Sequence, residues 1–207
     1  MIGVRGGTFD PIHTAHLRAT QEVAEALSLS QVRFIPGKLP PHRPQPDATA
    51  DQRLAMVELA IASNERFIAD DRELRREGYS YTVDTLRSLR QELGESEPLV
   101  LILGLDAFQG FTSWHEWEAI TTLAHLAVTS RPDYTAQPLQ AWAQAMQTDN
   151  AEELRNSPAG KLFFTDTTAL AISATDIRHQ QQEQRSIRYL LPDAVYDYIQ
   201  HQNLYRK

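Results

Sequence analysis

The residues with the clearest chemical use are His13 and His16, which lie three positions apart behind two adjacent glycines, Gly6 and Gly7. Glycines at the end of a strand let the backbone turn sharply and let a ligand approach the main chain. A helix that begins between the histidines, with Thr14 as its N-cap, would present N–H groups without internal partners and the positive end of its dipole. A phosphate would satisfy these groups, with both imidazoles beside it. The stretch therefore indicates a site for a phosphorylated ligand.

The same residues allow two simpler interpretations, a plain turn followed by surface histidines, or a pair of metal ligands. Helical zinc pairs are spaced by four residues rather than three, the chain has no cysteine, and no third ligand stands at a recognisable distance. We therefore expect no metal site on the protein. The residues alone leave the choice between a phosphate site and a plain turn open.

A second stretch of chemical interest, from Ile172 to Arg178, lies near the other end of the chain and reads Ile-Ser-Ala-Thr-Asp-Ile-Arg. Together with the stretch from Gly6 to His16, it resembles the two signature motifs of the HxGH nucleotidyltransferase superfamily. Ala15 replaces a Gly of the first motif, and Ala174 replaces a Ser of the second. The intervening segments follow the order of the bacterial nicotinate mononucleotide adenylyltransferases, namely Pro40 to Arg43, Tyr81 to Val83, Gly104 to Asp106 and Trp114 to Trp117. The resemblance covers nearly the whole chain.

The resemblance implies a reaction in NAD biosynthesis, in which the AMP group of ATP moves to nicotinate mononucleotide. The products would be nicotinate adenine dinucleotide and pyrophosphate, with Mg²⁺ bound to the triphosphate. Because the acceptor phosphate is itself a nucleophile, the protein would need only to align the two substrates and stabilise charge. The expected partners are therefore ATP and nicotinate mononucleotide.

The resemblance also implies roles for individual residues. Catalysis is assigned to His13, His16 and Arg178. ATP binding is assigned to Gly6, Gly7, Thr8, Phe9, Asp106, Ile172, Ser173 and Thr175. Binding of the second substrate is assigned to Lys38, His42, Arg43, Thr82, Val83, Trp114, His115 and Arg131.

Several of these residues also have structural roles open to them. Asp106 follows an apolar strand pattern, where it could bind a ribose or cap a helix. Trp114 could belong to the core, and Ser173 could form a plain capping box with Asp176. The basic residues between Pro36 and Pro46 could be solvated charges on a proline-rich loop.

Two other functions remain open. One is a different adenylyl- or cytidylyltransferase of the same superfamily, acting for example on phosphopantetheine or on nicotinamide mononucleotide. The other is a nucleotide-binding module without turnover, which the Ala15 departure allows.

Composition limits the possibilities further. A chain of 207 residues fits one domain, expected to span residues 1–207 with a helical part from about 172. The net charge of −7 argues against non-specific nucleic-acid binding, and the absence of cysteine excludes disulfides and a thiol nucleophile. Without an apolar signal segment or a run of membrane-spanning length, we expect a cytoplasmic protein that does not bind membranes. The sequence does not indicate an oligomeric state.

Alternating strand and helix patterns predict an α/β fold, a Rossmann-like doubly wound sheet of mainly parallel strands with helices on both faces. Strands are expected at 1–4, 32–35, 67–69, 99–103, 126–129 and 161–164. Helices are expected at 15–27, 51–62, 82–93, 113–123, 139–146, from Ser173, and at 192–201. Ser113 and Glu116 have capping-box spacing, which would place Trp114 in the first turn of a helix. Pro192 is expected at the first helical position, and the stretch 180–188 as a solvated face.

Overall fold

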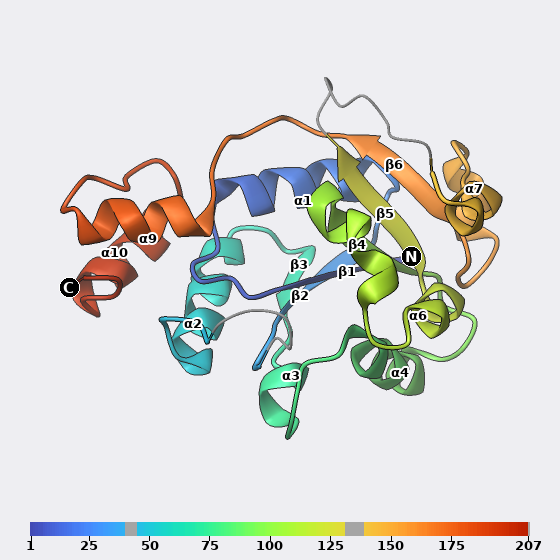
Figure 1. Ribbon diagram of the computed structural model, residues 1–207, viewed down its shortest axis with the longest axis horizontal. Coiled ribbons are helices and arrows are strands. Elements are labelled where there is room, and N and C mark those ends of the chain that lie inside the picture. The colour runs from blue at the N-terminus through green and yellow to red at the C-terminus, as the bar shows by residue number, and fades with distance from the viewer. Residues whose placement is uncertain (40–44, 131–138, 207) are drawn as a thin grey trace. The chain divides into compact units, whose positions relative to one another are not determined.

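The computed structural model describes residues 1–39, 45–130 and 139–206. Within these ranges the strands are β1 (Ile2–Gly7), β2 (Gln31–Pro36), β3 (Phe67–Ala69), β4 (Leu99–Gly104), β5 (His125–Ser130) and β6 (Leu162–Asp166). They form one sheet in the order β3-β2-β1-β4-β5-β6, with helices around it (Figure 1). The pairs β1–β4, β4–β5 and β5–β6 are parallel. This strand order is that of a doubly wound fold, so the predicted fold class is confirmed.

The helices lie between the strands and after β6. They are α1 (Thr14–Ala26), α2 (Ala50–Ile61), α3 (Arg72–Arg75), α4 (Thr82–Leu93), α5 (Leu105–Gln109), the 3₁₀ helix η1 (Phe111–Ser113), α6 (Trp117–Leu123), α7 (Ala141–Met146), α8 (Ala151–Arg155), α9 (Ala174–Gln182) and α10 (Asp193–His201). No helix in the described ranges is long and apolar enough to cross a membrane.

The contacts of the chain define two compact units, which we call the first unit and the second unit. The first unit consists of Met1–Arg5, Ala19–Arg33 and Tyr81–Ala169, and the second of Gly6–Arg18, Phe34–Ser80 and Leu170–Lys207. The single domain expected over residues 1–207 therefore stays a prediction.

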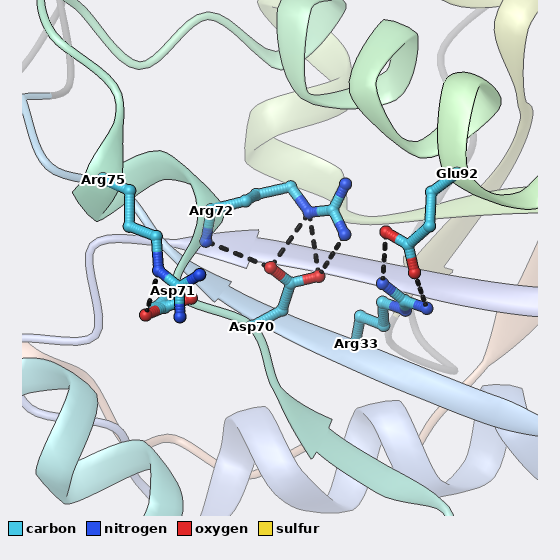
Figure 2. Close-up of polar contacts among 6 residues, drawn as sticks. All are labelled: Arg33, Asp70, Asp71, Arg72, Arg75 and Glu92. Carbon is cyan, nitrogen blue, oxygen red and sulfur yellow. Dashed lines mark hydrogen bonds and ion pairs between the residues drawn. The ribbon is translucent and has the colours of Figure 1, made fainter.

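The core of the first unit is built on β4 and β5, whose side chains are almost all buried. α4 packs against α6 in this unit. The guanidinium of Arg33 on β2 donates to both carboxylate oxygens of Glu92 on α4, at 3.1 and 2.7 Å (Figure 2). This bidentate pair links α4 to β2.

In the second unit α2 packs against β3 and α10. The chain leaves β3 through a turn in which the Asp70 carboxylate accepts hydrogen bonds from the backbone and side chain of Arg72 (Figure 2). The Asp70 N–H donates to the carbonyl of Phe34 on β2 at 2.9 Å. These bonds fix the start of α3 relative to the neighbouring strand.

Three predicted helix starts are wrong. α6 begins at Trp117 rather than Ser113, because Glu116 has a left-handed backbone with φ of 49° and interrupts the helix. The Ser113 hydroxyl donates to the Gly110 carbonyl instead of forming a capping box. Pro192 precedes α10 as its N-cap, with an extended ψ of 145°, and does not occupy its first position. Thr14 is the first residue of α1 rather than its N-cap.

The prediction of a solvated face over 180–188 is also wrong in part, since Gln181 and Ile187 are buried. The short helices α3, α5 and α8 were not predicted, because four or five residues are too few to show a helical periodicity. The other strands and helices lie within a few residues of the predicted ranges. The predicted cap Ser173 is confirmed, and α2 is capped by Thr49.

Candidate active site

The loop after β1 is shaped by close packing of Phe9 on Gly7. Phe9 is buried and has a left-handed backbone with φ of 51°. A Cβ atom placed on Gly7 would lie 2.8 Å from the Phe9 ring, whereas one on Gly6 would meet nothing within 4 Å. Gly7 is therefore required by the aromatic side chain two positions later, while Gly6 leaves an exposed, open stretch of main chain.

His13 and His16 meet at the start of α1, as their spacing predicts. Their rings stack with centroids 3.7 Å apart, and the edge of His16 also contacts Phe9 at 5.4 Å. The His13 carbonyl accepts the N–H groups of His16 and Leu17, so the helix begins between the two histidines. His13 is buried, and His16 is half-buried.

A backbone contact favours one tautomer of His16. The His13 N–H donates to the Nδ1 atom of His16 at 3.4 Å. An accepting Nδ1 leaves the proton of a neutral imidazole on Nε2. His16 therefore has a donor on the ring atom away from the main chain.

Arg178 on α9 is held against the same loop. Its Nη1 donates to the Asp10 carbonyl at 2.7 Å, and its Nε lies 3.0 Å from the Asp47 carboxylate. Ser173 caps this helix by accepting the Asp176 N–H at 3.1 Å. The structure thus brings Arg178 to the β1–α1 loop, within the second unit that also contains His13.

Asp10 is the centre of a buried network that the sequence did not reveal. Its carboxylate accepts the N–H groups of Asp47 and Ala48 at 2.9 and 3.1 Å, and the hydroxyl of Tyr205 at 2.8 Å. Burial, and next the Asp10 carboxylate, raise the pKa of the Tyr205 phenol well above its usual value. The phenol is therefore protonated at neutral pH and donates to the Asp10 carboxylate.

Arg53 on α2 supports the same loops from inside. Its side chain is only 1% exposed, and its Nη1 donates to the carbonyls of Thr8 and Gly37, both at 2.7 Å. Burial lowers the pKa of Arg53, and the nearby Asp10 carboxylate opposes this change. These bonds join the loops that follow β1 and β2.

The structure places Lys38 in the loop after β2, where its Nζ donates to the Arg76 carbonyl at 3.1 Å and its N–H to the Ser80 hydroxyl at 2.8 Å. Ile172 is half-buried and Thr175 exposed, before and within the first turn of α9. His42, Arg43 and Arg131 lie outside the described residues.

The first unit contains the other candidate residues. Thr82 and Val83 open α4, which has no side-chain cap at Tyr81. The rings of Tyr81 and His115 are 4.3 Å apart, and His115 Nε2 lies 3.3 Å from the Glu116 carboxylate. The structure therefore brings His115 to the N-terminus of α4.

Trp114 lies between η1 and α6 and is half-buried, with its ring 5.5 Å from the buried Phe111. Asp106 is exposed in the first turn of α5, whose N-cap is Gly104. Asp106 is therefore not the N-cap that one interpretation allowed, and its ribose role stays a prediction.

Comparison with known proteins identifies the family of the chain. The cytidylyltransferase-like family model matches residues 4–180. A probable nicotinate-nucleotide adenylyltransferase of Methylococcus capsulatus is 48% identical, with 100% of both chains covered. The chain belongs to the nicotinate-nucleotide adenylyltransferase family.

Other members of the nicotinate-nucleotide adenylyltransferase family are similar to this chain over its length. A relative from Yersinia enterocolitica is 45% identical over 97% of this chain and 93% of its own. The nicotinic acid mononucleotide adenylyltransferase of Plasmodium falciparum, solved in complex with NaAD, has the same fold. It shows a TM-score of 0.73 at 19% identity and covers 99% of this chain and 96% of its own.

The predicted site residues did not include three buried polar residues of this chain, Asp10, Arg53 and Tyr205. Arg53 had a detectable signal, because it occupies the buried stripe of α2 together with Met56 and Val57. A charged residue in such a stripe must be paired or hydrogen-bonded. Tyr205 had no such signal, since its contact with Asp10 joins residues 195 positions apart.

Proposed function

We propose that this chain transfers the AMP group of ATP to the phosphate of nicotinate mononucleotide, giving nicotinate adenine dinucleotide and pyrophosphate. The observation that carries this assignment is the 48% identity to a probable nicotinate-nucleotide adenylyltransferase over the full length of both chains. The stacked histidines at the start of α1 and the nearby Arg178 supply groups suited to phosphoryl oxygens.

The reaction is a displacement at phosphorus. A phosphate oxygen of nicotinate mononucleotide forms a bond to the α-phosphorus of ATP. The bond from that phosphorus to the oxygen bridging to the β-phosphate breaks, and pyrophosphate leaves with the electron pair. Since the acceptor phosphate is already anionic, no side chain has to remove a proton or form a covalent intermediate.

The protein then contributes orientation and charge stabilisation. His16 offers its Nε2 proton beside the N-terminus of α1, where the positive end of the helix dipole lies. Arg178 is oriented by its bonds to the Asp10 carbonyl and Asp47, which leave Nη2 as the remaining guanidinium nitrogen for a phosphoryl oxygen. Donors that are already oriented need no reorganisation as charge develops.

We treat Mg²⁺ as part of the substrate MgATP. Among the residues that the structure describes, no three His, Asp or Glu side chains gather to hold a metal ion. The family resemblance assigns the ion to the phosphate oxygens of ATP, where it would neutralise charge on the triphosphate. Excess EDTA should stop turnover, and added MgCl₂ should restore it.

We propose that the N-terminus of α4 and its neighbours recognise the nicotinate ring. The Thr82 hydroxyl and the backbone N–H groups of Val83 and His115 can all donate to a carboxylate. Trp114, half-buried on Phe111, would stack on the pyridine ring. These roles rest on the family resemblance, supported by the uncapped start of α4.

Mass-spectrometric identification of products tests the function. The purified protein with MgATP should convert nicotinate mononucleotide into nicotinate adenine dinucleotide, with one pyrophosphate released per dinucleotide. Parallel reactions would replace the acceptor by phosphopantetheine and ATP by CTP. Faster turnover of either alternative would contradict the proposal, as would the absence of turnover with all of them.

A further inference from the structure

Tyr205 forms a buried contact with the loop that carries the histidines. Its side chain lies in the segment after α10 and is only 7% exposed, and its hydroxyl donates to the Asp10 carboxylate at 2.8 Å. This hydrogen bond connects Tyr205 to the buried network around Asp10.

The backbone is shaped to place this side chain. After α10 ends at His201, Asn203 and Tyr205 have left-handed φ angles of 51° and 60°. The left-handed region is unfavourable for a bulky residue such as tyrosine, so contacts of its side chain must stabilise it there. α10 itself packs against α2, and the Leu204 N–H donates to the Ile199 carbonyl at 3.0 Å. The segment is thus turned back so that Tyr205 enters the interior.

Asp10 connects Tyr205 to the groups proposed for catalysis. The carboxylate of Asp10 is held by Tyr205 and by the N–H groups of Asp47 and Ala48, while its carbonyl accepts from Arg178 at 2.7 Å. The Nε of Arg178 pairs with Asp47, a neighbour in the same network. A change in the orientation of Asp10 would therefore move the Arg178 acceptor and the main chain that leads to His13.

We propose that Tyr205 is a positioning residue for adenylyl transfer, because its hydroxyl fixes Asp10 and through Asp10 orients Arg178 and the loop leading to His13. This inference rests on the function proposed above. Tyr205 does not touch the reacting atoms in this proposal, and it acts only through Asp10. A tyrosine that merely filled the core would serve equally well as phenylalanine.

The test is Tyr205→Phe, which keeps the ring and removes the hydroxyl. The matched control is Tyr198→Phe on α10, since the half-buried Tyr198 hydroxyl makes no hydrogen bond to the described residues. Active sites are counted by ATP-binding stoichiometry in calorimetry, well below the melting temperature. The same samples are then assayed for kcat and for KM with both substrates.

For Tyr205→Phe we expect full ATP stoichiometry, an ATP KM within about threefold of wild type, and a kcat lower by about tenfold, since small displacements of aligned groups have effects of this size. Tyr198→Phe should keep the wild-type kcat. A kcat per ATP-binding site within twofold of wild type would overturn the proposal, whatever the change in melting temperature. If the variant is partly unfolded, the assay is repeated in trimethylamine N-oxide, which favours the folded state.

Hydrogen–deuterium exchange provides a readout that does not require turnover. In Tyr205→Phe, amides in the peptide covering residues 8–17 should exchange several times faster, whereas those of β5 should be unchanged. Unchanged exchange in residues 8–17 would overturn the positioning role. Because exchange is measured without substrates, this result stays separate from a failure of wild-type protein to form the dinucleotide, which would contradict the proposed function instead.

Discussion

At the scale of single residues, the β1–α1 loop combines aromatic packing with buried and half-buried polar side chains. His16 stacks on the buried His13 and meets the edge of Phe9, so its ring has little freedom to turn. Its Nδ1 accepts from the main chain, which leaves Nε2 as the donor. An imidazole held in this way can stabilise developing charge without first being ordered.

His16→Ala should lower kcat by roughly two to three orders of magnitude and leave the fold intact, because it removes one oriented donor to transition-state charge. Steady-state kinetics and a far-UV melt would measure both effects. His201→Ala, at an exposed position on α10, is the control and should keep wild-type activity. Wild-type turnover in folded His16→Ala would exclude this helix start from the chemistry.

Gly7→Ala should lower the free energy of unfolding by about 1–3 kcal/mol, as overpacking commonly does. Its Cβ would lie 2.8 Å from the buried Phe9 ring. Gly6→Ala is the matched control and should change stability by less than about 0.5 kcal/mol, because nothing lies within 4 Å of its Cβ position. Urea unfolding of both proteins decides the point, and equal stabilities would mean that Phe9 moves aside freely.

At the scale of elements, buried polar side chains connect segments that the hydrophobic pattern alone would leave independent. Arg53 on α2 bonds to the loops after β1 and β2, and His125 on β5 bonds to residues in the segment that precedes β6. Each such link depends on a partner far away in the sequence. Removal of either side chain should therefore also destabilise the second element to which it is bonded.

Arg53→Met should lower the free energy of unfolding by about 3 kcal/mol or more, because the carbonyls of Thr8 and Gly37 lose the donor of the buried Arg53 and Asp10 loses a nearby cation. Arg75→Met is the control, since the Arg75 side chain is 78% exposed and its ion pair with Asp71 should contribute little. Denaturant unfolding would compare the two variants. A loss no larger than that of the control would show that Arg53 is not needed to hold the loops.

His125 should make stability depend on pH. Its Nε2 contacts the Ser157 carbonyl at 2.8 Å and its Nδ1 accepts the Lys161 N–H at 3.1 Å, so a neutral ring satisfies both contacts. Burial lowers the pKa of His125 in the folded state. Protonation would place a proton on Nδ1, so that two N–H donors, that of the ring and that of Lys161, would face each other. The unfolded chain therefore binds a proton first as the pH falls below about 6.5.

The stability contributed by neutral His125 should accordingly be full above pH of about 6.5 and decline below it, by at most about 1.4 kcal/mol per pH unit. Urea unfolding at several pH values would give this slope for wild type and for His125→Gln, which cannot titrate there. The difference between the two slopes isolates the histidine. Identical slopes would show that the folded protein accommodates the charged ring.

At the scale of the whole molecule, the fold could be predicted because local signals agreed with it. The strand predicted at 99–103 is the buried β4, and the helix predicted at 82–93 is α4, whose C-cap is Gly94 with φ of 89°. α6 could not be placed correctly, because the left-handed Glu116 leaves no mark in the spacing of Ser113 and Glu116. A capping box is only a local pattern, and here the tertiary structure overrides it.

In the candidate site, too, local contacts could be predicted and contacts between distant residues could not. His13 and His16 could be predicted to meet because three positions on one helix start determine their distance. The contacts of Arg178 with Asp10 and of Tyr205 with Asp10 could not, since they join residues 168 and 195 positions apart. Motifs therefore indicated the residues that would meet the substrates, and only the fold revealed the buried residues that hold them.

The preferred acceptor substrate follows from the hydrogen-bond donors expected around its pyridine ring. Thr82, Val83 and His115 would each donate to a carboxylate, whereas the NH₂ of a carboxamide would face a donor. At about 1–3 kcal/mol for each unmatched group, the nicotinate substrate should be preferred by ten- to a thousandfold.

A competition experiment measures this claim and the transfer itself together. Wild-type protein is given MgATP labelled at its α-phosphate and equal amounts of nicotinate mononucleotide and nicotinamide mononucleotide, and the labelled products are separated. We predict that the label enters nicotinate adenine dinucleotide at least tenfold faster than nicotinamide adenine dinucleotide, and that the released pyrophosphate is unlabelled. Label that stays in ATP, appears in pyrophosphate or enters mainly the nicotinamide dinucleotide would contradict the assignment.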